Sequence, residues 1–272
     1  MTPVPKLLRL DDHVVLDYVE QGDPAGVPLV LLHGYMDSWR SFERLLPHLP
    51  SSLHVFAVTQ RGHGDASRPA EGYATHDFAA DIGAFLDAVG LGAAVLVGGS
   101  SGGFAARRFA LDHPGRTLGL VLLGSPATLH DNAVVLKAWE TELSTLSDPL
   151  DPDFVRAFQV GTTVTPVPAV FLDAMVNESL KVPARIWTAV AKGLLEDASV
   201  NELAELQVPT LIVWGEEDAI VPRADQEWMA TSIANSALVV IPEVGHSFYW
   251  EAPERVAREL TEFAERLGRV ER

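Results

Sequence analysis

The stretch "VLVGGSSGGFAAR", Val95–Arg107, decides how this chain folds. A run of apolar, strand-favouring residues ends at Gly98, and a helix-favouring stretch begins only a few residues later. Gly98 and Gly102 stand two residues before and after Ser100. A strand that turns this sharply into a helix needs small neighbours, and the turn pushes the side chain at its corner out at the sheet edge. The helix start also points backbone N–H groups at that corner, which suits a developing negative charge.

The pattern Gly-x-Ser-x-Gly fits this stretch in two registers. One runs from Gly98 to Gly102 and centres on Ser100, and the other runs from Gly99 to Gly103 and centres on Ser101. A glycine-rich turn with two solvated serines would give the same letters. The motif alone therefore leaves open which serine, if either, has a chemical role.

Short apolar runs recur along the chain and are typical of strands. The first of them, residues 14–22, alternates apolar and polar residues as a half-exposed antiparallel strand does. The later runs are almost continuously apolar, as in strands that are buried on both faces of a parallel sheet. They occupy residues 28–34, 54–59, 93–99, 118–124, 209–215 and 237–243.

Helical patterns separate these runs at residues 41–49, 75–92 and 252–267. Alternating buried strands and helices predict an α/β fold with a mostly parallel sheet and helices on both faces. The alternation breaks between about Ala127 and Val200, where three or four helices follow one another. We predict a helical cap at residues 127–200, inserted into a core made of residues 1–126 and 201–272. The cap helices are expected at residues 132–146, 151–160, 168–180 and 184–195.

The composition excludes several classes of partner. The formal net charge of -17 disfavours nucleic acid and anionic membrane surfaces. The chain has no cysteine, so disulfides and thiolate metal sites are excluded. Its start lacks a signal-like apolar core, and no apolar run reaches the roughly 18 residues that a membrane helix needs. We expect a cytoplasmic protein that is a monomer or a homodimer.

A serine hydroxyl becomes a good nucleophile only when a base removes its proton and a carboxylate orients that base. Two loops late in the chain offer such groups. "VWGEEDAIVP" places Asp218 just after a buried run, with Glu216 and Glu217 as neighbouring carboxylates. "IPEVGHSFYW" places His246 after the last run and before the final helix. Ser, Asp and His in this chain order are one known arrangement of a catalytic triad.

Together these segments resemble the α/β-hydrolase fold superfamily, and in particular its capped serine esterases and lactonases. The resemblance covers residues 7–267 and implies an eight-stranded sheet. It implies that Ser100 is the nucleophile, His246 the base and Asp218 the acid. It also implies that "LLHGYMDSW", residues 31–39, forms an oxyanion hole in which the N–H groups of Tyr35 and Ser101 bind the oxyanion.

Three further residues have structural roles under this resemblance. His33 is expected to brace the oxyanion loop by hydrogen bonding, and Arg61 and His63 of "VTQRGHGDAS" are expected to be structural. The family often has Asp where this chain has Thr59. That difference concerns local packing rather than chemistry.

The serine nucleophile separates the chain from the dehalogenases and epoxide hydrolases of this fold, which use Asp. The loop after His33 also lacks the Gly-rich runs of prolyl iminopeptidases and of many carbon–carbon hydrolases. We expect cleavage of a hydrophobic ester or lactone through an acyl-enzyme, with no metal or cofactor. A cofactor-free perhydrolase or another acyl transferase, and a hydrolase-like ligand sensor, remain alternatives.

The cap is expected to form an apolar roof over Ser100 that favours uncharged substrates. Its large apolar residues, and those just beyond the catalytic loops, are candidates for the pocket wall. They are Leu129, Trp139, Phe158, Phe171, Met175, Trp187, Val221 and Phe248.

Overall fold

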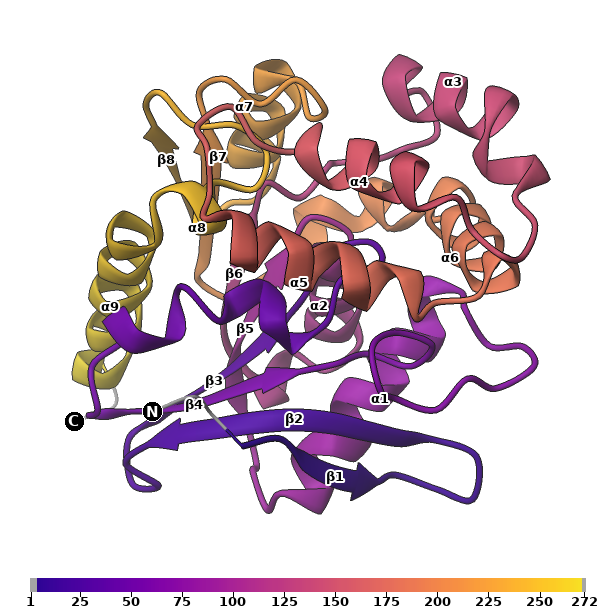
Figure 1. Cartoon of the computed structure of the whole chain (residues 1–272). Coiled ribbons are helices and arrows are strands. Elements are labelled where there is room, and N and C mark those ends of the chain that lie inside the picture. Colours follow the sequence, from indigo (N-terminus) through magenta and orange to yellow (C-terminus); the bar gives the residue numbers. More distant parts are fainter. Residues whose placement is uncertain (1–3, 271–272) are drawn as a thin grey trace.

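A twisted sheet of eight strands runs through the computed structural model, which describes residues 4–270 (Figure 1). The strand order is β1-β2-β4-β3-β5-β6-β7-β8. The pairs β1–β2 and β2–β4 are antiparallel, and all the others are parallel. The strands are β1 (Lys6–Arg9), β2 (Val15–Gly22), β3 (Val27–Leu32), β4 (Leu53–Val58), β5 (Ala94–Gly99), β6 (Thr117–Leu123), β7 (Thr210–Gly215) and β8 (Ser236–Ile241).

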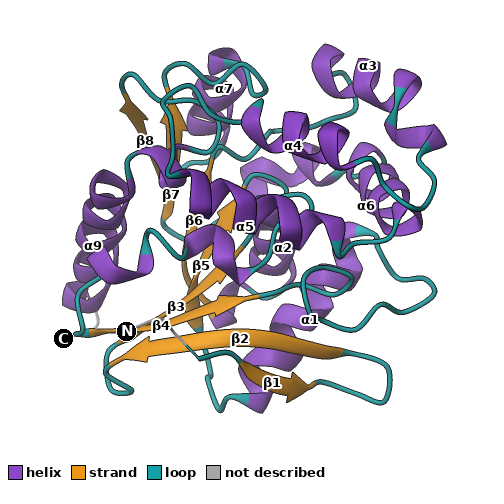
Figure 2. Cartoon of the chain, in the orientation of Figure 1, coloured by secondary structure: helices purple, strands orange, loops and turns teal. Residues whose placement is uncertain are grey.

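Helices cover both faces of the sheet because its central strands are apolar on both sides. On β3, Leu29 and Leu31 belong to a core cluster shared with α9, and Val30 and Leu32 belong to another shared with α1 and α2. Figure 2 shows α9 on one side of the strands and α1 and α2 on the other. The helices outside residues 127–200 are α1 (Thr75–Ala88), α2 (Gly102–Asp112), α7 (Arg223–Ser232), α8 (Phe248–Glu251) and α9 (Pro253–Val270). The predicted α/β fold is confirmed.

The stretch between β6 and β7 contains four α-helices close to the expected positions. Figure 1 shows them gathered beyond the ends of the central strands. Several of their side chains share a cavity with Ser100, which follows directly after β5. The helices are α3 (Ala133–Thr141), α4 (Pro152–Val160), α5 (Ala169–Leu180) and α6 (Ala184–Leu195).

One predicted helix is wrong. Residues 41–49 form no α-helix but contribute to two 3₁₀ turns, Trp39–Phe42 and Leu46–His48. Pro47 lacks an N–H group and disfavours a helical preceding residue, so a continuous helix cannot pass it.

None of the helices within residues 4–270 is long and apolar enough to cross a membrane.

Candidate active site

Ser100 occupies the sharp corner between β5 and α2. Its backbone has a φ of +48°, a left-handed conformation that costs free energy for a residue other than glycine. The glycines make the corner possible, since a Cβ at Gly98 would lie 2.4 Å from the Cα of Gly103, and one at Gly102 would lie 2.4 Å from the carbonyl oxygen of Leu32. Ser101 has an ordinary φ of −59° at the start of α2. The register that runs from Gly98 to Gly102 therefore describes the corner.

Ser100, His246 and Asp218 form a chain of hydrogen bonds. The imidazole Nε2 of His246 lies 2.8 Å from the Ser100 Oγ, and its Nδ1 lies 2.8 Å from the Asp218 Oδ2. Because a carboxylate only accepts, Nδ1 carries the proton and Nε2 accepts from the serine hydroxyl. The other carboxylate oxygen accepts from the N–H groups of Ile220 and Val221, at 2.8 and 2.9 Å. This arrangement fixes both the position and the tautomer of the imidazole.

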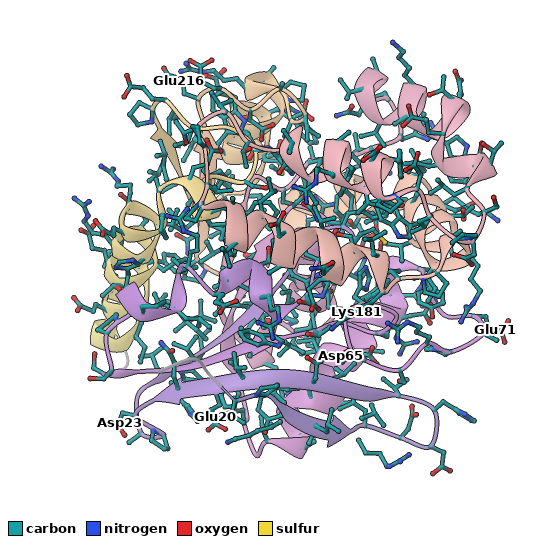
Figure 3. All side chains as sticks on the ribbon, viewed as in Figure 1. Glu20, Asp23, Asp65, Glu71, Lys181 and Glu216 are labelled. Atoms are coloured by element: carbon teal, nitrogen blue, oxygen red, sulfur yellow. The ribbon has the colours of Figure 1, made fainter. Side chains whose placement is uncertain are left out.

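The three carboxylates of the loop after β7 differ in burial. Asp218 is buried beside His246, whereas Glu216 and Glu217 are exposed. Glu216 projects from the surface in Figure 3. Of the three, only Asp218 is therefore hydrogen-bonded to the imidazole.

The loop after β3 is braced as expected. The His33 Nδ1 donates to the carbonyl of Gly34 at 2.8 Å, and its Nε2 accepts from the N–H of Gln60 at 3.0 Å. Burial lowers the pKa of His33 well below its usual value, so the ring stays neutral and keeps this pattern. Tyr35, next in the loop, lines the same cavity as Ser100 and Ser101. The structure thus brings both expected oxyanion residues to the serine.

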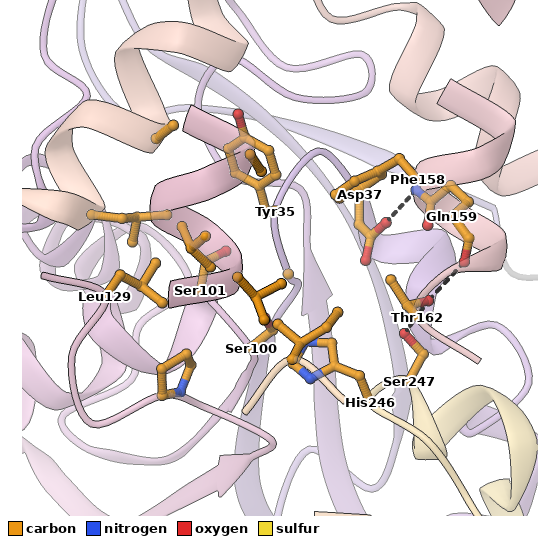
Figure 4. A pocket seen from close by; sticks show the side chains of 18 of the residues that line it. Tyr35, Asp37, Ser100, Ser101, Leu129, Phe158, Gln159, Thr162, His246 and Ser247 are labelled. Carbon is orange, nitrogen blue, oxygen red and sulfur yellow. Dashed lines mark hydrogen bonds between the residues drawn. The ribbon is translucent and has the colours of Figure 1, made fainter. Parts of the chain in front are cut away.

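A cavity of about 410 Å³ opens over Ser100 and His246 (Figure 4). Most of its wall is apolar and comes from α3, α4, α6 and the segments next to them, for example Val135, Leu143, Phe154 and Leu194. Its lining within residues 4–270 includes the carboxylates of Asp37 and Glu142 but no Lys or Arg. The site is therefore apolar, with a negative bias.

Comparison with known proteins agrees with this architecture. A profile of the alpha/beta hydrolase fold family matches residues 27–253. The chain belongs to this family. The AB hydrolase superfamily protein YisY of Bacillus subtilis is 27% identical over 269 residues, which cover 94% of this chain and 98% of that protein. Lipase 1 of Psychrobacter immobilis is 25% identical over 272 residues, which cover 93% of this chain and 81% of that protein.

The fold also matches solved structures of other alpha/beta hydrolases. The esterase EaEST of Exiguobacterium antarcticum superposes with a TM-score of 0.86 at 24% identity, covering 96% of this chain and 100% of that one. This likeness establishes the shared fold.

Two of the residues expected to line the pocket do so, Leu129 and Phe158. Trp187 lies outside the lining, because it is fully buried behind Tyr35 and Phe158, with ring centroids 5.5 and 5.3 Å away. Trp139 is also outside the lining and packs against the core.

The remaining four expected lining residues also lie outside the cavity wall. Phe171 packs edge-on against Trp250, and Met175 is fully buried in the same cluster. Val221 and Phe248 are fully buried, and Val221 supports Asp218 through its N–H group. A position just beyond a catalytic loop does not determine which way its side chain faces.

The cavity also has polar lining that the sequence analysis missed: Asp37, Gln159, Thr162, Ser247 and Tyr249. Burial raises the pKa of Asp37 to about 6, while hydrogen bonds from Gln159 and Ser41 partly oppose the shift. One signal was present in the sequence, because Gln159 is a polar residue between two apolar ones, Phe158 and Val160.

The loop that contains His246 is fastened to the segment after α4. The Ser247 N–H donates to the Thr162 carbonyl at 2.8 Å, and the Ser247 Oγ donates to the Thr162 Oγ1 at 2.9 Å. The Glu251 Oε2 accepts from the N–H groups of Val164 and Thr165, and its Oε1 accepts from the N–H of Gly245. These contacts tie the His246 loop to the segment between α4 and α5.

The segment from Val58 to Ser67 is structural, as expected. Arg61 forms a two-pronged pair with Asp81, with both N–O distances at 2.6 Å. The Thr59 Oγ1 donates to the Asp17 Oδ2 at 3.0 Å and accepts from the N–H of Trp39. A carboxylate from β2 thus lies beside the position where the family often has Asp.

His63 belongs to the same structural segment. Its Nδ1 lies 2.8 Å from the Arg61 carbonyl, and burial lowers its pKa to about 4.

Within the described part of the chain, no three His, Asp or Glu side chains gather into a set that could hold a metal ion.

Replacing the first glycine of the corner tests its geometry. Gly98→Ala is expected to cost roughly 3 kcal/mol or more of unfolding free energy, because the new Cβ meets the backbone of Gly103 and neither segment can move away. Chemical denaturation measures the change. Gly92→Ala is the matched control, since a Cβ there meets nothing within 4 Å. Equal stability of the two variants would contradict this account of the corner.

Proposed function

We propose that this protein is a serine hydrolase that cleaves an apolar carboxylic ester or lactone through an acyl-enzyme. The observation that carries the proposal is the unbroken chain from the Ser100 Oγ through His246 to Asp218. Ser100 and His246 open into an apolar cavity, where an ester could be bound. The lipase of Psychrobacter immobilis, a relative over most of both chains, supports the same reaction class.

The proposed reaction begins with proton transfer. His246 takes the hydroxyl proton of Ser100 as the serine oxygen attacks the carbonyl carbon. The resulting oxyanion accepts hydrogen bonds from the N–H groups of Tyr35 and Ser101, an interaction typically worth about 10²–10³ in rate for each donor. His246, held by Asp218, then protonates the leaving alcohol. Water repeats the sequence on the acyl-enzyme and releases the acid.

The predicted cap, residues 127–200, has a defined role in this proposal. Its helices α3, α4 and α6 supply much of the apolar wall, while the core of residues 1–126 and 201–272 supplies the reacting groups. An apolar, water-poor wall strengthens the electrostatic interactions at the reacting carbonyl. The cap therefore both selects the substrate and assists the chemistry.

The two serines provide a direct test. Ser100→Ala is expected to reduce the kcat for p-nitrophenyl butyrate by roughly 10⁵-fold or more, because among the described residues no other hydroxyl is bonded to the His246 imidazole. Ser101→Ala keeps the N–H group and is expected to reduce the rate by no more than about tenfold. The opposite ranking of the two variants would move the nucleophile to Ser101.

Peracid formation, measured beside ester hydrolysis, tests whether peroxide replaces water as the acceptor of the acyl group.

The orienting acid is tested separately. Asp218→Asn is expected to lower kcat about 10⁴-fold, because an amide N–H facing Nδ1 favours the wrong imidazole tautomer. Glu217→Gln is the control, since it changes an exposed carboxylate of the same loop. Steady-state kinetics on both variants gives the comparison. Activity near that of the wild type in Asp218→Asn would reassign the acid.

Substrate charge tests the character of the cavity. Ethyl hexanoate is expected to have a kcat/KM roughly 10²-fold or more above that of monoethyl adipate, which carries a carboxylate in place of the terminal methyl. A carboxylate would enter an apolar cavity that already holds Asp37 and Glu142 and has no lining Lys or Arg among the described residues. Titration of released acid measures both reactions. Comparable values for the two esters would contradict the predicted selectivity.

A further inference from the structure

The cavity over Ser100 has two chemically different ends. Figure 4 shows Asp37, Gln159, Thr162 and Ser247 together on one side of Ser100 and His246, and Leu129 on the other. We call these four residues the polar end. The rest of the wall is mostly apolar and includes Val135, Leu143, Phe154, Phe158 and Leu194. A single ester bound across Ser100 would therefore place its two halves in different surroundings.

The polar end is held rigidly by hydrogen bonds between its own members. The Gln159 Nε2 donates to the Asp37 Oδ1 at 3.0 Å and to the Ser179 Oγ at 2.7 Å. The other Asp37 oxygen, Oδ2, accepts from the Ser41 Oγ at 2.9 Å, and that hydroxyl accepts in turn from the Trp250 indole at 3.0 Å. Asp37 and Gln159 are 4% and 1% exposed. Neither side chain needs to reorganise when a ligand arrives.

The hydrogens of the polar end are all used within the protein. The Ser247 Oγ donates to the Thr162 Oγ1, and that hydroxyl donates to the Gln159 carbonyl at 2.8 Å. Both hydrogens of the Gln159 amide are already donated. Asp37 has no hydrogen when ionised, but its two oxygens offer about four acceptor positions, of which two are occupied. The polar end therefore offers acceptors to a ligand and needs a ligand that brings a donor.

The position of His246 indicates which half of the ester meets the polar end. The general acid must reach the oxygen of the leaving alcohol, so the alcohol lies on the His246 side of the carbonyl. Ser247 follows His246 directly, and its hydroxyl donates to the Thr162 Oγ1 of the polar end. The alcohol half is thus directed to the polar end, and the acyl chain to the apolar one.

We propose that Asp37 determines the substrate class by accepting a hydrogen bond from a hydroxyl group on the alcohol half. The preferred substrate is then an ester of an apolar acid with a small hydroxylated alcohol, such as a diol or polyol. This inference rests on the proposed ester hydrolysis. Asp37 is buried, and no Lys or Arg among the described residues lines the cavity. An apolar alcohol group is a poor ligand there, because it leaves the free acceptor positions of the carboxylate without a donor.

Two esters of equal size test the inference. 2-Hydroxyethyl hexanoate and propyl hexanoate differ only in a hydroxyl that replaces a terminal methyl. We expect wild-type protein to favour the hydroxyethyl ester by at least about tenfold in kcat/KM, as for a hydrogen bond to a charged group. Asp37→Asn is expected to bring the ratio of the two values within about threefold. Glu142→Gln removes the other, exposed carboxylate of the cavity and is expected to keep the wild-type ratio.

Each outcome of this experiment is decisive. A wild-type ratio near one would overturn the inference while leaving ester hydrolysis intact, and it needs no variant to fold. If Asp37→Asn kept the full wild-type preference for the hydroxyethyl ester, Asp37 would not be the acceptor. Faster cleavage of 2-aminoethyl hexanoate than of the hydroxyethyl ester would overturn the hydroxyl as the preferred ligand group and indicate an ammonium group instead. Failure to cleave any of these esters would contradict the proposed function itself.

Discussion

The left-handed backbone at Ser100 is the constraint on which the rest of the site depends. A serine with a φ of +48° is strained, and this conformation persists only because the packing of the surrounding segments holds the backbone in it. Gly98 and Gly102 let β5, α2 and the end of β3 approach more closely than any Cβ would allow. That close approach exposes the Ser100 hydroxyl to His246, and it sets the start of α2 beside the loop of Tyr35.

The features predictable from the sequence are those that depend on local chemistry. Buried parallel strands such as β3 and β7 are short apolar runs, so they stand out. The strand β1 was not predicted, because it has only four residues and most of them are exposed, which leaves no hydrophobic pattern. The sequence predicts one helix where the structure has two 3₁₀ turns, because apolar spacing alone does not distinguish an α-helix from such turns.

The site divides in the same way. Chain order and loop position led to Ser100, Asp218 and His246, and the structure brings their side chains together. The cavity wall was much less predictable, because it depends on which side of each helix between β6 and β7 faces inward. Trp187 has a size that suits a pocket wall, yet it is packed behind Phe158. The sequence around Asp37 does not indicate a role in the cavity, because Asp37 is hydrogen-bonded there to Gln159, which lies 122 residues away in the chain.

The contacts between the His246 loop and the segment after α4 have a consequence for how firmly the wall of the cavity is held. Thr162, Val164 and Thr165 are fastened to Ser247 and Glu251, so this segment cannot move away without displacing the His246 loop. The helix α3, by contrast, contains no fully buried residue. The wall of the cavity is therefore anchored firmly beside His246 and more loosely at α3.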